Sequence, residues 1–121
     1  MKVHSKMKNG YIERVYQKCL AIEFEKAALS FKEEIDMPIF YDETIVGRRR
    51  AYFIIESKVV IELKSVTNLE NEHIVQALNY LETSGLEICL LINFGSKSLQ
   101  FKRLISERKR VVINPTNHTN L

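Results

Sequence analysis

A nearly continuous apolar run, Glu87–Asn93, lies between two glycines, Gly85 and Gly95, in this 121-residue sequence. An apolar run of this length that is bounded by turn-forming residues is typical of a β-strand buried on both faces of a sheet. A membrane-spanning helix needs about 20 apolar residues, far more than any run here. We therefore expect a globular domain with no membrane partner.

The other apolar patterns predict two main helices and four further strands around that run. The second main helix stands between the third and fourth strands, which favours a mixed sheet of about five strands in an α/β (α+β) fold. Pro38 makes the first strand an edge or irregular strand. One domain is expected over residues 1–113, followed by a polar tail over 114–121. The expected elements cover residues 11–29, 31–41, 51–55, 59–63, 70–84, 87–93 and 99–105, with a short helical piece before the turn at Asn9-Gly10.

Charge is unevenly distributed along the chain, although the net charge is only +3. Acidic residues outnumber basic ones between Glu13 and Glu43, basic residues outnumber acidic ones between Ser96 and Arg110, and Arg48–Arg50 form a second basic cluster. Guanidinium groups match the oxygens of a phosphate, so these clusters suit a nucleic-acid backbone. A solvated basic surface with no such partner is the commoner explanation.

Cysteine and histidine are scarce in this chain. The two cysteines, Cys19 and Cys89, lie within apolar patterns without CxxC spacing, and we expect buried thiols in a reducing compartment. They form no zinc signature with the three histidines, and the sequence has no P-loop, nucleophile elbow or GxGxxG motif. The first residues lack the apolar stretch of a signal peptide, so we expect a cytoplasmic location.

Glu62 and Lys64 lie at the end of one predicted strand, two residues apart. Side chains alternate along a strand, so these two share one face while Leu63 takes the other. A carboxylate beside an ammonium group can hold a divalent metal ion and orient a water molecule for phosphodiester hydrolysis. An ordinary ion pair at the edge of a sheet is the simpler alternative.

Two predicted helices carry further polar residues. Gln76 and Tyr80 are four residues apart, which places them on one helical face together with His73. Such a face suits the wall of a groove, and plain solvent exposure explains it equally well. Glu13 lies one turn before Tyr16 beside the apolar stripe of the first helix, and a half-buried carboxylate needs a base or a metal ion. An internal salt bridge is the simpler account of Glu13.

Taken together, these groups resemble the GxxExxY protein family, a branch of the PD-(D/E)XK nuclease superfamily. Glu62-Leu63-Lys64 resembles the ExK half of the nuclease motif, and the pair Gln76 and Tyr80 resembles the QxxxY motif of RecB-like nucleases. The resemblance spans nearly the whole domain. Its remaining matches are Gly10, Glu13 and Tyr16, which give the family its name, together with Val3-His4, Leu91–Gly95 and Lys102-Arg103.

The resemblance implies a restriction-endonuclease-like core that hydrolyses DNA with Mg²⁺ or Mn²⁺ at a site where the two middle strands separate. Glu62 would bind the metal ion, with Glu13 as an auxiliary acid and ligand. Lys64 would activate the attacking water or stabilise charge. Gln76 would orient the water or a phosphate, with Tyr80 behind it. The residues implied to contact phosphates are Arg48, Arg49, Arg50, Lys102 and Arg103.

The sequence departs from the family pattern at Tyr52, which stands where active relatives have a metal-binding aspartate. A neutral phenol, with a pKa of about 10, is a poor ligand for Mg²⁺. We therefore expect hydrolysis to be weakened or lost, with the metal ion held weakly or not at all. Two alternatives remain open: a non-catalytic module that binds nucleic acid or a protein, and a small domain whose exposed strand edge pairs with a second copy as a homodimer.

Overall fold

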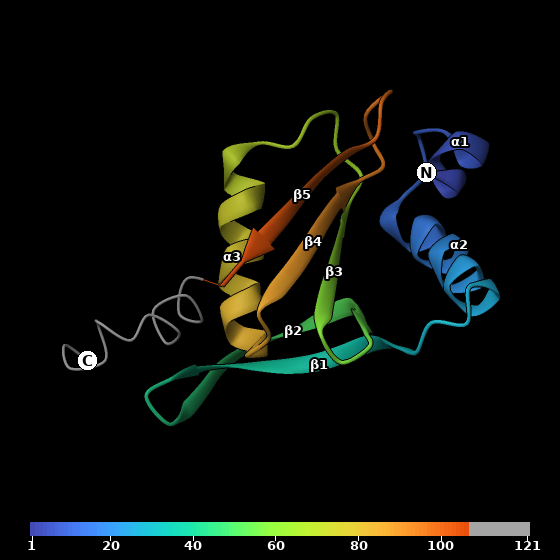
Figure 1. Cartoon of the computed structure of the whole chain (residues 1–121). Helices are drawn as coiled ribbons and strands as arrows, with labels where there is room; N and C mark the ends of the chain where they lie inside the picture. Colours follow the sequence, from blue (N-terminus) through green and yellow to red (C-terminus); the bar gives the residue numbers. More distant parts are fainter. Residues whose placement is uncertain (107–121) are drawn as a thin grey trace, which may run out of the picture.

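The computed structural model describes residues 1–106, which form a five-stranded sheet with helices on both faces (Figure 1). Helices α1 and α2 cover one face and α3 covers the other. The mixed α/β fold with five strands and two main helices is confirmed. The elements are α1 (Lys2–Met7), α2 (Glu13–Lys26), β1 (Phe31–Tyr41), β2 (Thr44–Ile55), β3 (Val59–Lys64), α3 (Asn71–Ser84), β4 (Ile88–Asn93) and β5 (Gln100–Ile105).

The strands lie side by side in chain order, from β1 at one edge to β5 at the other. Antiparallel pairing joins β1 to β2, β2 to β3 and β4 to β5, whereas β3 and β4 are parallel because α3 carries the chain back across the sheet. The apolar run is β4, which contributes side chains to the clusters under both α2 and α3. Pro38 lies in the edge strand β1, where its missing N–H leaves no gap in the centre of the sheet.

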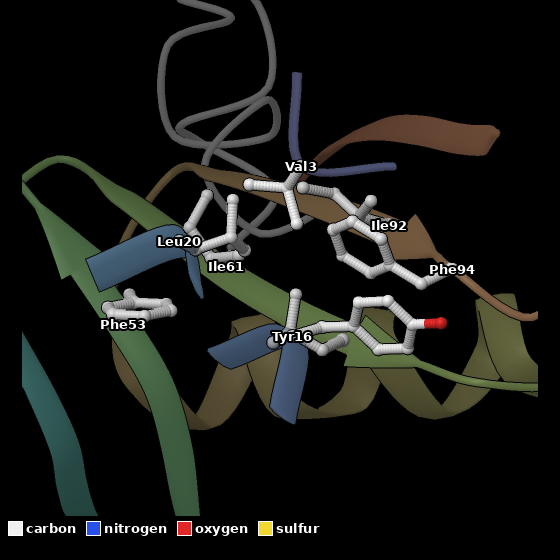
Figure 2. Packing of buried hydrophobic residues seen from close by; sticks show 8 residues of the cluster. Val3, Tyr16, Leu20, Phe53, Ile61, Ile92 and Phe94 are labelled. Atoms are coloured by element: carbon white, nitrogen blue, oxygen red, sulfur yellow. The ribbon is translucent and has the colours of Figure 1, made fainter. Parts of the chain in front are cut away.

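Each face of the sheet has its own apolar cluster. Figure 2 shows the α2 side, where Tyr16 and Leu20 of α2 pack against Phe53, Ile61 and residues of β4. The cluster on the α3 side consists of Met37, Ala51, Val60, Ala77, Leu81, Cys89 and Leu91. Burial there raises the pKa of the Cys89 thiol to about 12, so this thiol stays protonated.

Strand β2 changes direction at Tyr52. Phe53 belongs to the cluster under α2 and Ala51 to the cluster under α3, although residues two apart on a regular strand share a face. On the partner strand β1, Glu34 has a φ of 51°, in the left-handed region. Only the end of β2, from Phe53 to Ile55, pairs with β3. The two middle strands therefore separate beside Glu62.

Several element boundaries differ from the sequence-based expectations. Helix α2 begins at Glu13 because Gly10 has a φ of 117° and Ile12 is extended, and it ends before Ala28, whose φ is 58°. Strand β2 begins seven residues before the expected start at 51, since the basic stretch continues the hairpin with β1. The expected end of the domain, 107–113, and the polar tail, 114–121, lie outside the described residues.

Among residues 1–106, no helix has the length and apolar character needed to cross a bilayer.

Candidate functional site

Strand β3 carries Glu62 and Lys64 to the sheet face that α3 covers. Ile61 and Leu63 belong to the cluster under α2, so the residues between and after them point the other way. Glu62 is only 3% exposed, and Lys64 is partly exposed at the end of the strand. The predicted alternation of this strand is therefore confirmed, and it places a carboxylate in a nearly dry environment.

The buried Glu62 carboxylate forms a two-point ion pair with Arg49 of β2. Arg49 Nη1 donates to Glu62 Oε2 at 2.5 Å, and Nη2 donates to Oε1 at 2.7 Å. The two side chains are 12% and 5% exposed, and the guanidinium carbon lies 3.6 Å from the centre of the Tyr80 ring. Burial raises the pKa of Glu62, and the charges of Arg49 and Lys64 oppose that rise. Arg49 thus opposes, through its charge and its hydrogen bonds, the rise in pKa that burial imposes on Glu62.

The second acid of the site, Glu13, is held at the start of α2. The Tyr52 hydroxyl donates to Glu13 Oε1 at 2.6 Å, and the Ser65 backbone N–H donates to Oε2 at 3.2 Å. Burial and the bond to Glu13 both raise the pKa of Tyr52, so its phenol remains a neutral donor at physiological pH. A cavity of about 460 Å³ opens beside Glu13 and is also lined by Gly10, Tyr11, Ile12, Ser65, Val66 and Thr67.

Helix α3 contributes Gln76 and Tyr80 to the site, whereas His73, predicted on the same helical face, lies elsewhere. Gln76 accepts a hydrogen bond through Oε1 from Lys64 Nζ at 3.0 Å, and Tyr80 lies under the Arg49 guanidinium. His73 instead accepts a bond from the Glu70 backbone N–H through Nδ1 at 2.8 Å, in a capping box at the start of the helix. The structure therefore brings Glu62, Lys64, Gln76 and Tyr80 together, and assigns His73 to helix capping.

The three consecutive arginines do not form one cluster. Arg48 and Arg50 are exposed and pair with Asp36 at 2.7 Å and Glu34 at 3.3 Å, whereas Arg49 points inwards to Glu62. On β5, the opposite edge of the sheet, Lys102 and Arg103 are exposed. Sequence reasoning treated Arg49 as a phosphate contact and missed its part in the site. The signal that points to it is a lone acid in an apolar strand, which needs a buried counter-charge.

The donor set fits a divalent metal ion poorly. Mg²⁺ prefers several hard, anionic oxygens in near-octahedral geometry. The two expected ligands, Glu62 and Glu13, already accept hydrogen bonds on all four carboxylate oxygens, from Arg49, Tyr52 and Ser65. Across residues 1–106, no group of three or more His, Cys, Asp or Glu side chains is placed to hold a metal ion.

Tyr16 connects the loop before α2 to the core. Its hydroxyl donates to the Lys8 carbonyl at 2.6 Å and accepts from the Tyr11 N–H at 3.2 Å, and its ring stacks on Phe94 with centroids 4.5 Å apart. The side chain is fully buried. The loop that these bonds order leads directly into Glu13.

Replacing Tyr16 with phenylalanine is expected to lower the free energy of unfolding by about 1–2 kcal/mol, because two backbone groups lose their partner while the ring stays packed. Urea denaturation followed by circular dichroism measures this change. Tyr41→Phe is the matched control, since Tyr41 is 71% exposed. Equal stabilities of the two variants would contradict the assigned role of the Tyr16 hydroxyl.

The sequence matches a family model, and the fold matches solved structures. Residues 1–104 match the family model described as the PD-(D/E)XK nuclease superfamily. No curated protein sequence matches the chain significantly.

Two solved structures resemble the fold. The crystal structure of SSO0001 aligns with a TM-score of 0.62 and 16% identity, over 87% of this chain and 56% of that one. An alkaline exonuclease, LHK-Exo from Laribacter hongkongensis, aligns with a TM-score of 0.57 and 12% identity, over 88% of this chain and 62% of that one. The chain thus spans less than two thirds of either protein, and at these identities the likeness concerns the fold alone.

Proposed function

Because the chain belongs to the PD-(D/E)XK nuclease superfamily, we propose that it binds nucleic acid on a nuclease fold whose metal-dependent phosphodiester hydrolysis is weakened or lost. The observation that carries the proposal is the two-point ion pair between Glu62 and Arg49. In the expected mechanism Glu62 binds the metal ion, and here its two oxygens are bound by a guanidinium group instead.

Within the superfamily, we assign the chain to the GxxExxY family. The three residues of that motif act together in this fold: Gly10 turns the chain, Tyr16 orders the loop and Glu13 reaches the end of β3. This arrangement supports the assignment because it gives each motif residue a separate physical role. Glu13 would remain an auxiliary acid, although Tyr52 and the Ser65 backbone N–H now bind its carboxylate.

The remaining catalytic residues fit an inactive site better than an active one. In an active site, Lys64 would activate the water and Gln76 would orient it. Here the Lys64 ammonium donates a hydrogen bond to the Gln76 side-chain oxygen instead. Tyr52 offers a neutral hydroxyl where an aspartate would offer an anionic ligand. These contacts support a loss of hydrolysis while leaving the fold complete.

Exposed basic side chains other than Arg49 support nucleic-acid binding, with DNA as the first substrate to test. Lys102 and Arg103 project from β5, and Arg48 and Arg50 lie on β2 with acidic neighbours. Phosphate contacts of this kind give an affinity that falls with salt. Arg49 is excluded from this proposed surface because its side chain is only 12% exposed and its guanidinium binds Glu62.

We expect the protein to bind duplex or single-stranded DNA in EDTA, and to leave plasmid DNA uncut with Mg²⁺ or Mn²⁺. Fluorescence anisotropy over a range of salt concentrations measures the binding. The double variant Lys102→Glu/Arg103→Glu should bind more weakly and reduce the salt slope by about 2, one for each lost phosphate contact. Lys32→Glu/Lys58→Glu is the matched control, because it makes the same charge change at exposed positions away from β5.

Two results would contradict this function. Metal-dependent cleavage that disappears in Lys64→Ala would identify an active nuclease. An absence of DNA binding at low salt would leave the protein-binding alternative, which one observation favours: Phe40, Tyr41, Ile45 and Val46 are exposed near the tip of the β1–β2 hairpin. Sedimentation equilibrium at several concentrations would then test whether that tip forms a homodimer.

A further inference from the structure

We infer that Arg49 is a built-in counter-cation that takes the place of a divalent metal ion at Glu62, and that it, more than Tyr52, keeps metal ions out of the site. This inference rests on the proposed loss of metal-dependent hydrolysis and assigns the cause to one residue. If Tyr52 were the sole departure and Arg49 did not bind Glu62, the Glu62 carboxylate would remain free to bind an ion.

The first step concerns charge. A buried carboxylate requires a positive partner in contact with it, and Glu62 is almost fully buried. The nearby ammonium of Lys64 donates to Gln76. Among residues 1–106, Arg49 is the one basic residue within hydrogen-bond distance of both Glu62 oxygens, so it provides the neutralisation that a metal ion would otherwise provide.

The second step concerns how firmly Arg49 is held. The central carbon of its guanidinium lies over the Tyr80 ring, 3.6 Å from the ring centre, and the side chain is 12% exposed. Stacking on an aromatic ring and a two-point hydrogen bond both restrict a guanidinium group. Arg49 is therefore a fixed part of the site, in contrast to Arg48 and Arg50 beside it, whose ion pairs are exposed to solvent.

The third step concerns space and repulsion. A metal ion on Glu62 would have to share both carboxylate oxygens with Arg49, and it would lie within a few ångströms of a positive guanidinium in a poorly solvated region. Like charges at that distance repel strongly when water is excluded. Changing Tyr52 to an aspartate would add a ligand but would leave this repulsion in place.

The test compares Mn²⁺ binding by four proteins: the unmodified chain, Tyr52→Asp, Arg49→Gln/Tyr52→Asp and Arg48→Gln/Tyr52→Asp. Isothermal titration calorimetry measures the affinity, and the electron paramagnetic resonance signal of free Mn²⁺ reports binding without any assay of cleavage. We expect Arg49→Gln/Tyr52→Asp to bind Mn²⁺ at least about 100-fold more tightly than the other three. Arg48→Gln is the matched control, because it removes the same charge from the adjacent exposed position.

A further variant separates charge from hydrogen-bond geometry. Arg49→Lys/Tyr52→Asp keeps the positive charge but loses the planar two-point bond, and we expect it to remain without bound Mn²⁺. If Arg49→Gln/Tyr52→Asp is unfolded in metal-free buffer, millimolar Mn²⁺ should refold it, since an ion that binds only the folded state stabilises that state.

Three outcomes would overturn the inference. In the first, Tyr52→Asp binds Mn²⁺ as tightly as Arg49→Gln/Tyr52→Asp does. In the second, Arg49→Gln/Tyr52→Asp is folded but binds no Mn²⁺. In the third, that double variant is unfolded and Mn²⁺ does not refold it. The first leaves the proposed loss of hydrolysis intact and transfers its cause to Tyr52. Binding of Mn²⁺ and cleavage of DNA by the unmodified chain would instead refute the proposed function itself.

Discussion

Replacement of Arg49 with glutamine is expected to lower the free energy of unfolding by about 3–5 kcal/mol, because it leaves the buried Glu62 carboxylate without a counter-charge. The Glu62 side chain is 5% exposed, so water cannot take over the solvation that the guanidinium provides. Glutamine carries no charge and ends two bonds short of the Nη atoms that bind Glu62. Urea denaturation monitored by circular dichroism, with the unfolding midpoint and slope fitted separately, measures the loss.

The matched control is Arg48→Gln, which removes an exposed ion pair with Asp36 and should cost about 0–1 kcal/mol. A second control, Arg49→Met/Glu62→Gln, removes both charges and should recover most of the lost stability. Similar stabilities of Arg49→Gln and Arg48→Gln would mean that Glu62 does not depend on Arg49.

The Arg49→Gln variant should also change how stability depends on pH. Burial raises the pKa of Glu62 and Arg49 opposes the rise, so without Arg49 the folded-state pKa moves further above the unfolded value. The folded state then binds the proton more tightly than the unfolded state, and stability falls as pH rises between those two pKa values. We therefore expect the deficit of Arg49→Gln to be smallest near about pH 4 and to grow towards neutral pH, as thermal melts across that range would show.

Replacement of Gly95 with alanine is expected to cost about 3 kcal/mol or more, because the new methyl group has no space. A Cβ atom at Gly95 would lie 2.4 Å from both the backbone nitrogen and the backbone oxygen of Val66, and 2.6 Å from the Ser65 carbonyl carbon. These atoms cannot move away easily, since Asn93 Nδ2 donates to the Val66 carbonyl and the Val66 N–H donates to Asn93 Oδ1, each at 2.9 Å. Chemical denaturation again gives the change in free energy.

Gly47→Ala is the control for this substitution. A Cβ atom there would meet only the Ile39 Cδ1 at 3.8 Å, an ordinary contact, so the stability should change by less than about 1 kcal/mol. If Gly95→Ala were as stable as Gly47→Ala, the close approach of the β3–α3 loop to the end of β4 would not be required for folding.

Much of the fold could be predicted from local patterns. The apolar run of β4 and the alternation in β3 each depend on neighbouring residues, and they correctly indicate a strand buried on both faces and a Glu62 carboxylate on the face opposite Leu63. Gly85, with a φ of 74°, ends α3 as expected from its place in the sequence.

The inward position of Arg49 could not be predicted in the same way. It depends on the change of direction at Tyr52, which reverses the faces of the residues before it. The unusual φ of Glu34 on the neighbouring strand accompanies that change, and no local pattern marks an acidic residue as adopting a left-handed backbone. A single sequence therefore indicates that the buried Glu62 needs a partner, but it does not indicate which of three adjacent arginines provides it.

The limited pairing between β2 and β3 also has a consequence for the motions of the molecule. Beyond Phe53, towards its tip, the β1–β2 hairpin has ladder hydrogen bonds only between its own two strands. Near the tip, the residues from Phe40 to Val46 are exposed. Local opening requires little loss of buried surface there, so amide hydrogens of the tip should exchange with solvent through fluctuations smaller than global unfolding. Nearer the base of the hairpin, Arg49 contacts Tyr80 of α3 and Tyr52 packs against the cluster under α2. Amide hydrogens there should exchange only when the core of the sheet opens.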